Sequence, residues 1–572
     1  MLSTVGHRGR RTEIATTGGV AVGVCRPDAE ASASLATHGA LVAAVSGTFD
    51  NADEPDLATL EVLAGRRDAA ALLLAAYRRW GATAVTRLRG SFSGVVTDGT
   101  FVLAFRDHFG ARPLFHHESS RGWFAATEVK QIVAGADLPR EPDLDHLERI
   151  LYGNVGESTA VRGISRVPRG AAGLTRTVGV APRFRRYWDP ARLVESSDGM
   201  GAEDARDGLM AALDRATARM LRGEDVILLS GGLDSPALAA SAVRAPLGST
   251  VRGLTAIYPD YPSVDERPWA ELVADHLGMP LTTYVAEAAA MDDVELWTAR
   301  LDGPVDVLSI PECAAAYTAA RSLGARTVLN GEVAEYLLDS RSALLGHLLY
   351  RGRWRALAHQ ADLRRSRGRR WRRILREVAR DAAPVGLMMW HHDRRGRWEA
   401  TIPTWLDQDR AMAVLDRPST RPWDRWSVLQ TSAFSGAGHQ LEADEITAAY
   451  CGVDTRRPFT DVDLWEFVLG LPAEIKLDDL RPKQLLREGL RGRLPDAHLD
   501  RRDKTLFDEF HLAHADYPIL KGLLAQPEHH IGGVDYEALQ ARLETGSMSV
   551  AELRWARDLA RIHAYLTGLD RP

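Results

Sequence analysis

Four apolar residues at 226–229 run directly into Ser-Gly-Gly-Leu-Asp-Ser at 230–235, and this junction limits the possible folds most strongly. A short apolar run that stops at two glycines is typical of a buried strand entering a sharp turn. Downstream, strands and helices are predicted to alternate: the helices begin at residue 236 and span 265–277, and the strands lie at 251–257 and 327–329. This alternation indicates an open parallel sheet, and ligands bind such sheets at the carboxyl ends of the strands.

The glycines of this loop suit it to hold an anion. Gly231 and Gly232 let backbone N–H groups face a ligand, and the helix that follows adds its positive end. Because the loop lacks the lysine of a Walker A motif, we expect Asp234 to hold a magnesium ion on bound phosphates rather than a lysine to hold the γ-phosphate. The alternative is an ordinary strand-to-helix turn capped by Asp234 or Ser235.

Residues before about 190 follow a different pattern. Apolar segments at 39–45, 91–96 and 100–105 predict strands, and a helix is expected over 68–80. Many strands with few helices favour an α+β layered sandwich. We interpret the polar residues 195–201 as a linker between two domains, 1–190 and 205–572.

Composition excludes several classes of protein. The 572 residues are too many for one hydrophobic core, and 71 Lys+Arg against 77 Asp+Glu give a formal net charge of -6, so no overall field favours nucleic acid. Cys25, Cys313 and Cys451 are scattered, which predicts a reducing cytoplasm and neither zinc nor disulfides. No run of 18 apolar residues occurs, so no membrane-spanning helix is expected.

Further short motifs follow the loop in a fixed order. They are Asp265-Glu266, Thr327-Val-Leu-Asn-Gly-Glu332, Arg457-Pro-Phe-Thr-Asp461, Lys483-Gln-Leu-Leu-Arg487 and Arg501-Arg-Asp-Lys504. Together they resemble the ATP-pyrophosphatase synthetase domain of the asparagine synthetase family over about residues 205–510, a more specific match than any single motif. The resemblance implies an adenine-nucleotide α-hydrolase-like parallel-sheet domain with a helical insertion, which uses ATP and Mg²⁺.

The first domain has its own resemblance. Leu88-Arg-Gly-Ser-Phe92, the segment 105–115 and Ala126-Thr-Glu-Val-Lys130 are similar to the class II glutamine amidotransferase domain, an Ntn-hydrolase-like fold. That family's nucleophile is a cysteine directly after Met1, where this chain has Leu2, and its glutamine-gripping Asn-Gly-Glu corresponds best to Ser46-Gly-Thr48. We therefore expect no glutamine hydrolysis, a structural role for this domain and another source of the nitrogen nucleophile.

The resemblance also assigns residues of the nucleotide site. Asp234 and Glu335 are expected to bind magnesium; Glu335 replaces the family's Asp, and Val333 replaces a glycine and makes the turn stiffer. Lys483 is expected either to touch pyrophosphate or only to line a helix face. The expected nucleotide-binding residues are Leu229, Ser230, Gly231, Gly232, Asp234, Ser235, Ile257, Gly331 and Lys483.

Two residues are assigned catalytic roles by the same resemblance. Glu332 matches the residue that faces the activated carboxylate and takes a proton from the attacking amine. An α-amine with a pKa of about 7.7–8.0 is largely protonated near neutrality and needs such a base. Lys504 matches the lysine that neutralises charge at the reacting phosphorus and at the tetrahedral oxyanion.

The most specific resemblance is to the lasso peptide cyclases, which join a peptide's N-terminal amine to an Asp or Glu side chain of the same peptide. It rests on the missing glutaminase residues, on Glu332 and on the altered segment Val333-Ala-Glu-Tyr336. The alternatives are an ammonia-dependent asparagine synthetase, a small-molecule amide or β-lactam synthetase, and a scaffold that binds ATP or peptide without catalysis. Glu332 argues modestly against a β-lactam synthetase, because those relatives carry Tyr at this position.

An arginine-rich segment bears on possible partners. Residues 351–380 contain many arginines against Asp362 and Glu377, with Trp354 and Trp371 between them, and 387–390 follow as Leu-Met-Met-Trp. The segment is suited to dock a leader-cleaved precursor peptide, a leader-peptide-binding protein or a leader peptidase. A solvated helical insertion explains the same charges equally well.

Overall fold

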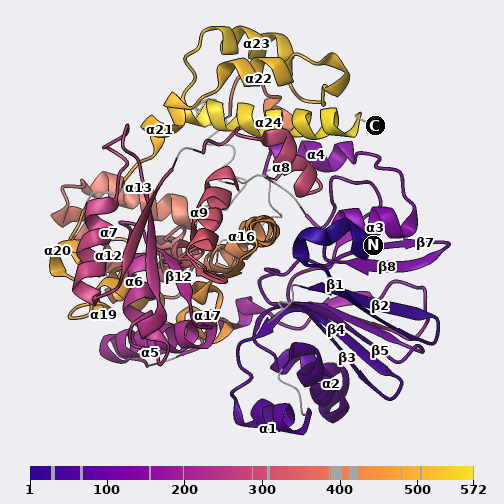
Figure 1. Ribbon diagram of the computed structural model, residues 1–572. Coiled ribbons are helices and arrows are strands. Elements are labelled where there is room, and N and C mark those ends of the chain that lie inside the picture. The colour runs from indigo at the N-terminus through magenta and orange to yellow at the C-terminus, as the bar shows by residue number, and fades with distance from the viewer. Residues whose placement is uncertain are drawn as a thin grey trace.

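The computed structural model has two halves that meet side by side and a helical cap above both (Figure 1). It describes the chain except residues 27–32, 65–67, 154–155, 198, 287, 306–309, 340, 385–386, 388–401, 411–420, 422, 478–479, 503–504 and 571–572, and the side chains of 63–64 and 432–438.

The first half is built on a six-stranded antiparallel sheet with the order β11-β10-β6-β5-β4-β3. Its strands are β3 Ala33–His38, β4 Leu41–Phe49, β5 Gly90–Thr97, β6 Val102–Arg106, β10 Ala171–Thr175 and β11 Arg183–Arg186. Successive side chains of a strand face opposite sides, so Ala43 and Val45 pack with the helices α1 Pro55–Ala64 and α2 Ala69–Trp80. Val42 and Ala44 instead pack with the hairpin β1 Arg11–Thr17 and β2 Val20–Arg26. This alternation produces the layered sandwich.

A smaller sheet and two helices extend this half toward the rest of the molecule. The three-stranded sheet has the order β8-β7-β9 and is antiparallel. The elements are β7 Phe115–Ser119, β8 Gly122–Ala126, β9 Ser165–Arg166, α3 Val129–Ala136 and α4 Leu144–Leu151.

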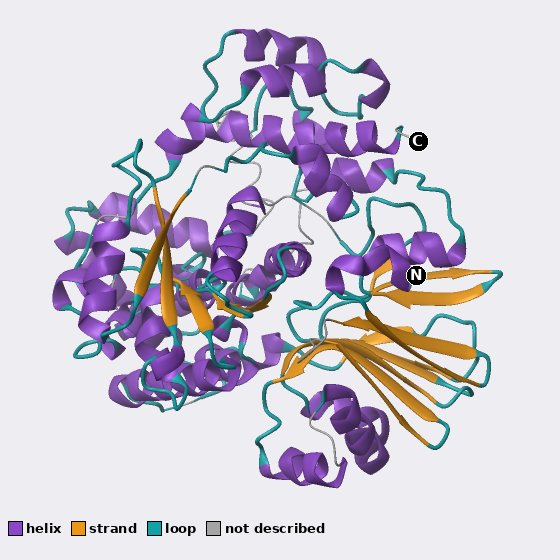
Figure 2. Cartoon of the chain, viewed as in Figure 1, coloured by secondary structure: helices purple, strands orange, loops and turns teal. Residues whose placement is uncertain are grey.

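The second half contains a five-stranded parallel sheet with the order β14-β13-β12-β15-β16 (Figure 2). Its strands are β12 Asp225–Leu228, β13 Arg252–Ile257, β14 Leu281–Val285, β15 Thr327–Leu329 and β16 Asp454–Arg456. The chain adds strands on one side of β12 up to β14 and then crosses to the other side at β15. The carboxyl ends of β12 and β15 therefore form the topological switch point, where open α/β sheets bind ligands.

Helices cover both faces of this sheet, because its strands are apolar on both sides. Ile227 and Leu329 belong to a core that includes α5, α6, α7, α17 and α19, whereas Val226 and Val328 pack on α9 and α16. These helices, with the shorter ones between them, are α5 Ala202–Met220, α6 Asp234–Ala242, α7 Arg267–Leu277, α8 Val294–Arg300, α9 Ile310–Ser322, α10 Ala334–Leu338, α16 Arg425–Tyr450, α17 Val462–Gly470, α18 Ala473–Lys476, α19 Gln484–Gly489 and α20 Asp496–Leu499.

Two further helical parts complete the molecule. An insertion follows α10 and consists of α11 Leu344–Tyr350, α12 Trp354–Ser366 and α13 Trp371–Ala382. The cap consists of α21 Asp508–Ala513, α22 Tyr517–Leu524, α23 Tyr536–Glu544 and α24 Val550–Leu569. Its core includes Leu147 and Leu151 of α4, so the cap packs on the first half as well as on the second.

The predicted fold class is confirmed: an Ntn-hydrolase-like layered sandwich precedes a parallel-sheet synthetase half with a helical insertion. The expected linker at 195–201 is anchored at one end, because the Glu195 side chain is only 5% exposed and lies 2.8 Å from His347 and 2.7 Å from Arg353. None of the described helices combines the length and the hydropathy that a membrane span requires.

Candidate nucleotide and amide-forming site

Two loops leave the parallel sheet at the switch point and touch each other. One follows β12 and leads into α6, and the other follows β15 and contains Gly331 and Glu332. A Cβ atom added to Gly331 would lie 2.9 Å from the Cβ of Asp234 and 2.9 Å from the backbone N of Ser235. Glycine at this position therefore lets the second loop approach the first closely.

The first loop has a carboxylate bound to one of its backbone N–H groups. Gly231 N–H donates to Glu266 Oε2 at 3.0 Å, while Ser230 N–H donates to Ser235 Oγ at 2.8 Å and Gly232 N–H to Ser230 Oγ at 3.2 Å. An anion thus already lies against the loop, as expected at the start of a helix. Phosphate oxygens of a nucleotide have the charge and acceptor groups to replace Glu266 there.

Side chains from residues 498–501 hold the loop's carbonyl groups. His498 Nε2 lies 2.9 Å from Gly232 O, and Arg501 donates to Gly231 O at 2.8 Å while its guanidinium lies 4.9 Å from the Trp269 ring centroid. Burial lowers the pKa of His498, so the ring is neutral and its proton must lie on Nε2 to serve this bond. Lys504, predicted to be catalytic, lies outside the described residues.

Lys483 lies at the loop, although its sequence position is equally compatible with a helix face. Its Nζ is 2.5 Å from Asp234 Oδ2, and both side chains are largely buried. The residue precedes α19 in a left-handed conformation, with φ of 55°. This geometry places a positive charge beside the carboxylate that is expected to carry magnesium.

The residues present fit a magnesium ion that is held mostly by phosphates. Asp234 supplies one carboxylate beside the loop, while Glu335 lies exposed in the first turn of α10 and has no ion pair among the described residues. No group of three His, Cys, Asp or Glu side chains in the described part of the chain could hold a metal ion by itself. Magnesium ordinarily takes one or two carboxylates plus substrate phosphates and waters, and it would neutralise charge on the leaving pyrophosphate.

The turn between Glu332 of the second loop and Glu335 of α10 is strained. Val333 is buried and has φ of 76°, a left-handed conformation that a β-branched residue rarely adopts. Such conformations cost about 1–3 kcal/mol and persist where surrounding packing enforces them. The turn was expected to be stiff because Val333 replaces a glycine. In the structure Val333 has a left-handed backbone conformation and connects Glu332 to the start of α10.

Glu332 is held at both carboxylate oxygens. Arg457 Nε donates to Oε2 at 2.9 Å, and Gln440 Nε2 lies 3.4 Å from Oε1. Arg457 is almost fully buried, whereas the Glu332 side chain is 25% exposed. The carboxylate is therefore fixed in orientation and still reachable by a substrate, as a general base requires.

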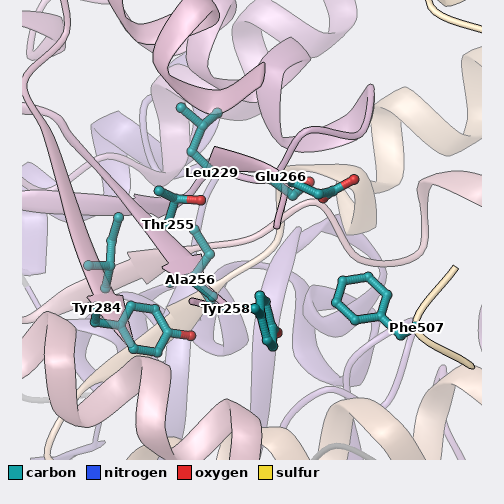
Figure 3. A pocket seen from close by; sticks show the side chains of 10 residues that line it. Leu229, Thr255, Ala256, Tyr258, Glu266, Tyr284 and Phe507 are labelled. Atoms are coloured by element: carbon teal, nitrogen blue, oxygen red, sulfur yellow. The ribbon is translucent and has the colours of Figure 1, made fainter. Parts of the chain in front are cut away.

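A cavity of about 160 Å³ opens at the carboxyl ends of β12 and β13 (Figure 3). Its walls are residues 228–230 and 254–256 together with Tyr258, Glu266, Tyr284 and Phe507. Apolar strand ends and aromatic rings suit a planar base next to a phosphate-binding loop. Burial raises the pKa of Tyr258 and Tyr284, so both phenols stay protonated and can donate hydrogen bonds.

The cavity shows which residues the sequence pattern missed. Ile257 was expected at the nucleotide, but the lining residues are its neighbours Ala256 and Tyr258. Alternation along β13 does not select them, because the consecutive residues 254–256 all line the cavity and Tyr258 follows the end of the strand. No pattern in the sequence points to Tyr284 or Phe507, which come from other segments.

In the first half, the segment 46–48, which corresponds best to the family's glutamine-gripping motif, is packed and hydrogen-bonded within the protein. Gly47 has φ of 101°, and a Cβ there would lie 2.0 Å from Ser91 O. Thr48 Oγ1 donates to Asp50 at 3.1 Å and accepts from Arg456 of the second half. Cys25 is buried on β2, and its Sγ donates to Gly9 O at 2.9 Å.

The arginine-rich segment forms the helices α12 and α13. Glu377 pairs with Arg369 at 2.7 Å and also lies 3.3 Å from Arg364 and 3.5 Å from Arg373. The Trp354 and Trp371 side chains are exposed on the surface. Residues 388–390, the end of the apolar run after this segment, lie outside the described residues.

The fold and the site define an α/β protein with a candidate nucleotide site at the switch point of its sheet, joined to an amidotransferase-like half. Comparison with known families is more specific. Residues 208–565 match the model described as Asparagine synthase, and residues 59–188 match the Glutamine amidotransferase domain. The chain belongs to the asparagine synthase family, whose members are ATP-dependent ligases that form carbon–nitrogen bonds.

Individual relatives agree with this assignment. A Mycobacterium tuberculosis protein assigned as a glutamine-hydrolyzing asparagine synthetase is 26% identical over 475 residues, which cover 76% of this chain and 69% of the relative. Asparagine synthetase [glutamine-hydrolyzing] 3 of Bacillus subtilis is 24% identical over 481 residues, covering 78% and 71%. Carboxyethyl-arginine beta-lactam-synthase of Streptomyces clavuligerus is 30% identical over 225 residues, covering 38% and 40%.

Among solved structures, glutamine phosphoribosylpyrophosphate amidotransferase from B. subtilis matches 57% of this chain and 76% of its own, at 15% identity and a TM-score of 0.23.

Proposed function

We propose that this protein is an ATP-dependent peptide cyclase that closes the macrolactam ring of a lasso peptide. An Asp or Glu side-chain carboxylate of a leader-cleaved precursor peptide attacks the α-phosphate of ATP, and pyrophosphate leaves. The N-terminal amine of the same peptide then attacks the acyl-adenylate, gives up its proton and displaces AMP. The peptide loses one water, and the free energy comes from ATP.

The observation that carries the proposal is the fixed position of Glu332 beside the nucleotide loop. Gly331 packs on Asp234 in the loop that is expected to bind phosphates, and Glu332 is the next residue in the chain after this contact. Arg457 and Gln440 hold it there. A base at this place can take the proton of an incoming amine, and general bases of this kind contribute about 10²–10⁴-fold to rate.

A peptide amine is favoured over ammonia released from glutamine. Ser46 and Thr48 correspond best in sequence to the residues with which the amidotransferase family grips glutamine, and Thr48 is tied to Asp50 and Arg456. The three cysteines lie at positions 25, 313 and 451. A peptide that carries both reacting groups also gains from holding them at high effective concentration.

A small-molecule amide or β-lactam synthetase is the second candidate. The Streptomyces clavuligerus relative, 30% identical over 225 residues, favours it. Glu332 in place of tyrosine argues against it. An ammonia-using asparagine synthetase and a non-catalytic scaffold are outcomes of the same experiment.

The test incubates the protein with magnesium and ATP and follows AMP and product mass. Parallel reactions contain a leader-free precursor peptide from a neighbouring gene, aspartate with ammonium, or a carboxyethyl amino acid. The expected result is AMP together with a peptide lighter by one water. AMP only with aspartate and ammonium, or only with the small amino acid, would instead identify the corresponding alternative. If no substrate releases AMP, the reactions are repeated with the neighbouring leader peptidase and leader-binding protein added, and continued absence of AMP would identify the scaffold.

A further inference from the structure

Helix α16 lies between the two halves and contacts both of them (Figure 1). Its final turns include the polar side chains of Gln440, Glu442, Asp444 and Glu445. With 3.6 residues per turn, positions 442 and 445 lie on one side of the helix, and positions 440 and 444 lie on nearly the opposite side. The helix therefore presents two different polar faces.

The face at 442 and 445 is held by arginines of the first half. Glu442 lies 2.8 Å from Arg106 and 3.0 Å from Arg166. Glu445 lies 2.7 Å from Arg112 and 2.9 Å from Arg8. All six side chains are at most 13% exposed.

The face at 440 and 444 holds the surroundings of Glu332. Gln440 lies 3.4 Å from one oxygen of Glu332. Asp444 pairs with Arg457 and also accepts from the Tyr317 hydroxyl. Arg457 in turn donates to the other oxygen of Glu332 at 2.9 Å. Both contacts to the carboxylate therefore depend on the rotation and height of α16.

We propose that the amidotransferase-like half is a positioning part for the amide-forming step: its four arginines fix α16 through Glu442 and Glu445, and α16 thereby orients Glu332 through Gln440, Asp444 and Arg457. This inference rests on the function proposed above, in which Glu332 is the base. Gln440 and Arg457 are positioning residues in this arrangement, and so are the arginines.

Charges suit this task better than apolar contacts would. A buried ion pair is a weak source of net stability because desolvation offsets its attraction, whereas the directional hydrogen bonds of Arg–carboxylate pairs favour one geometry. Apolar side chains are non-directional and tolerate small rotations of a helix. A shift of about 1 Å at a reacting group can cost about 10²-fold in rate, so fixing the helix has a direct effect on catalysis.

The first test measures hydrogen exchange in the free protein and needs no substrate. The double variant Glu442→Gln and Glu445→Gln keeps hydrogen-bonding groups of the same size while removing both negative charges. The matched control is Glu148→Gln, because Glu148 of α4 in the first half lies 2.9 Å from Arg410 of the second half, and neither residue is on α16. We expect backbone exchange at 330–338 to rise at least about tenfold in the double variant. Exchange at 226–235 should stay unchanged, and the control should change neither segment. Unchanged exchange at 330–338 would overturn the proposal.

The second test separates the two half-reactions with the leader-free peptide, magnesium and ATP. Hydroxylamine is largely unprotonated at neutral pH, so its capture of the acyl-adenylate needs no base and reports adenylation alone. The double variant should form hydroxamate at the wild-type rate within about twofold but close the ring at least about tenfold more slowly. Glu148→Gln should match the wild type in both reactions. Equal losses in both half-reactions with a lower melting temperature would show a merely structural role.

A pH profile distinguishes a displaced base from a damaged substrate site. Ring closure by the double variant should recover toward high pH, where the amine is deprotonated without Glu332. Arg457, Gln440 and Tyr317 face that carboxylate, and Asp444 reaches it through Arg457; all four are retained in the variant. Glu332→Gln provides the reference. If it closes rings as fast as the wild type, the base role fails; if only Glu332→Gln is impaired and the double variant is not, the positioning role fails.

Discussion

The loop after β12 and strand β4 handle their polar groups in opposite ways. At the loop, the Gly231 N–H group donates to Glu266, and Lys483 pairs with Asp234. These contacts lie next to a cavity, so a ligand can replace the partners. On β4, Thr48 is tied to Asp50 and to Arg456, whose side chain is 4% exposed. Polar groups can bind a ligand when their present partners can be exchanged for it. Polar groups that buried ion pairs surround cannot exchange partners and so do not bind a ligand.

Replacement of Asp234 by Asn, at the loop after β12, should give the largest effect. The variant loses the carboxylate that is expected to hold magnesium on the phosphates, and adenylation should fall at least about 10³-fold. Hydroxamate formation with magnesium and ATP measures it. Asp500→Asn, which removes an exposed acid paired with Arg491, is the control and should leave the rate unchanged. Normal adenylation by Asp234→Asn would remove the metal role.

Replacement of Glu332 by Gln should affect only the second half-reaction. Amide formation should fall about 10²-fold, because the amine must then lose its proton without a positioned base, while adenylation persists. Hydroxamate and product mass measured in the same samples separate the two steps. A loss of both would indicate that Glu332 contacts the nucleotide instead.

Acid should weaken the charged joint, the ion-paired contact between the halves that includes Arg112, Glu445 and Asp454. Burial by itself raises the pKa of Asp454, but Arg112 and Arg456 outweigh it and hold the pKa at about 2. The unfolded chain binds this proton first, so the contribution is complete above about pH 4 and is lost as the pH falls toward 2. The loss amounts to about 2 kcal/mol, or about 30-fold in the folding equilibrium. Urea unfolding at pH 2–5 measures it, and Asp454→Asn should flatten this dependence.

Replacement of Glu335 by Gln should have a moderate effect that concerns magnesium alone. The side chain is exposed and makes no ion pair among the described residues, so we expect adenylation to fall about tenfold and to recover at higher magnesium concentration. A titration of magnesium at fixed ATP measures this shift. An unchanged magnesium dependence would remove Glu335 from the metal site.

Replacement of Ser46 by Ala gives the smallest effect and tests the inactive side of the comparison. Ser46 lies on β4 opposite Ser93. Both half-reactions should stay within about twofold of the wild type, because the change removes one hydroxyl from a half-buried strand residue and alters none of the arginines that hold α16. A large loss of activity would show that this region still serves the reaction.

The sequence predicted the sheets better than it predicted the site. Alternating apolar residues located β4, β5 and β6, and the glycine junction located β12 and the start of α6. These signals are local, because each depends only on the spacing of neighbouring residues. Tyr284 and Phe507 were missed because they reach the cavity only after distant segments pack together.

The surroundings of Glu332 were hidden for a similar reason. Arg457 belongs to a recognised motif, yet its contact to Glu332 spans 125 positions of sequence. The two faces of α16 become meaningful only when the partners on each side are known. The left-handed conformation of Val333 is also invisible in sequence, since packing imposes it against the residue's own preference.

The charged joint has a consequence for the response of the molecule to heat. Ions are hydrated less favourably as temperature rises, so the desolvation penalty of buried pairs such as Arg112–Glu445 shrinks on warming. Apolar contacts gain no such benefit, because their stabilisation per unit area levels off. The two halves should therefore remain docked close to the temperature at which the helices and sheets themselves melt, so that heating unfolds them as one cooperative unit.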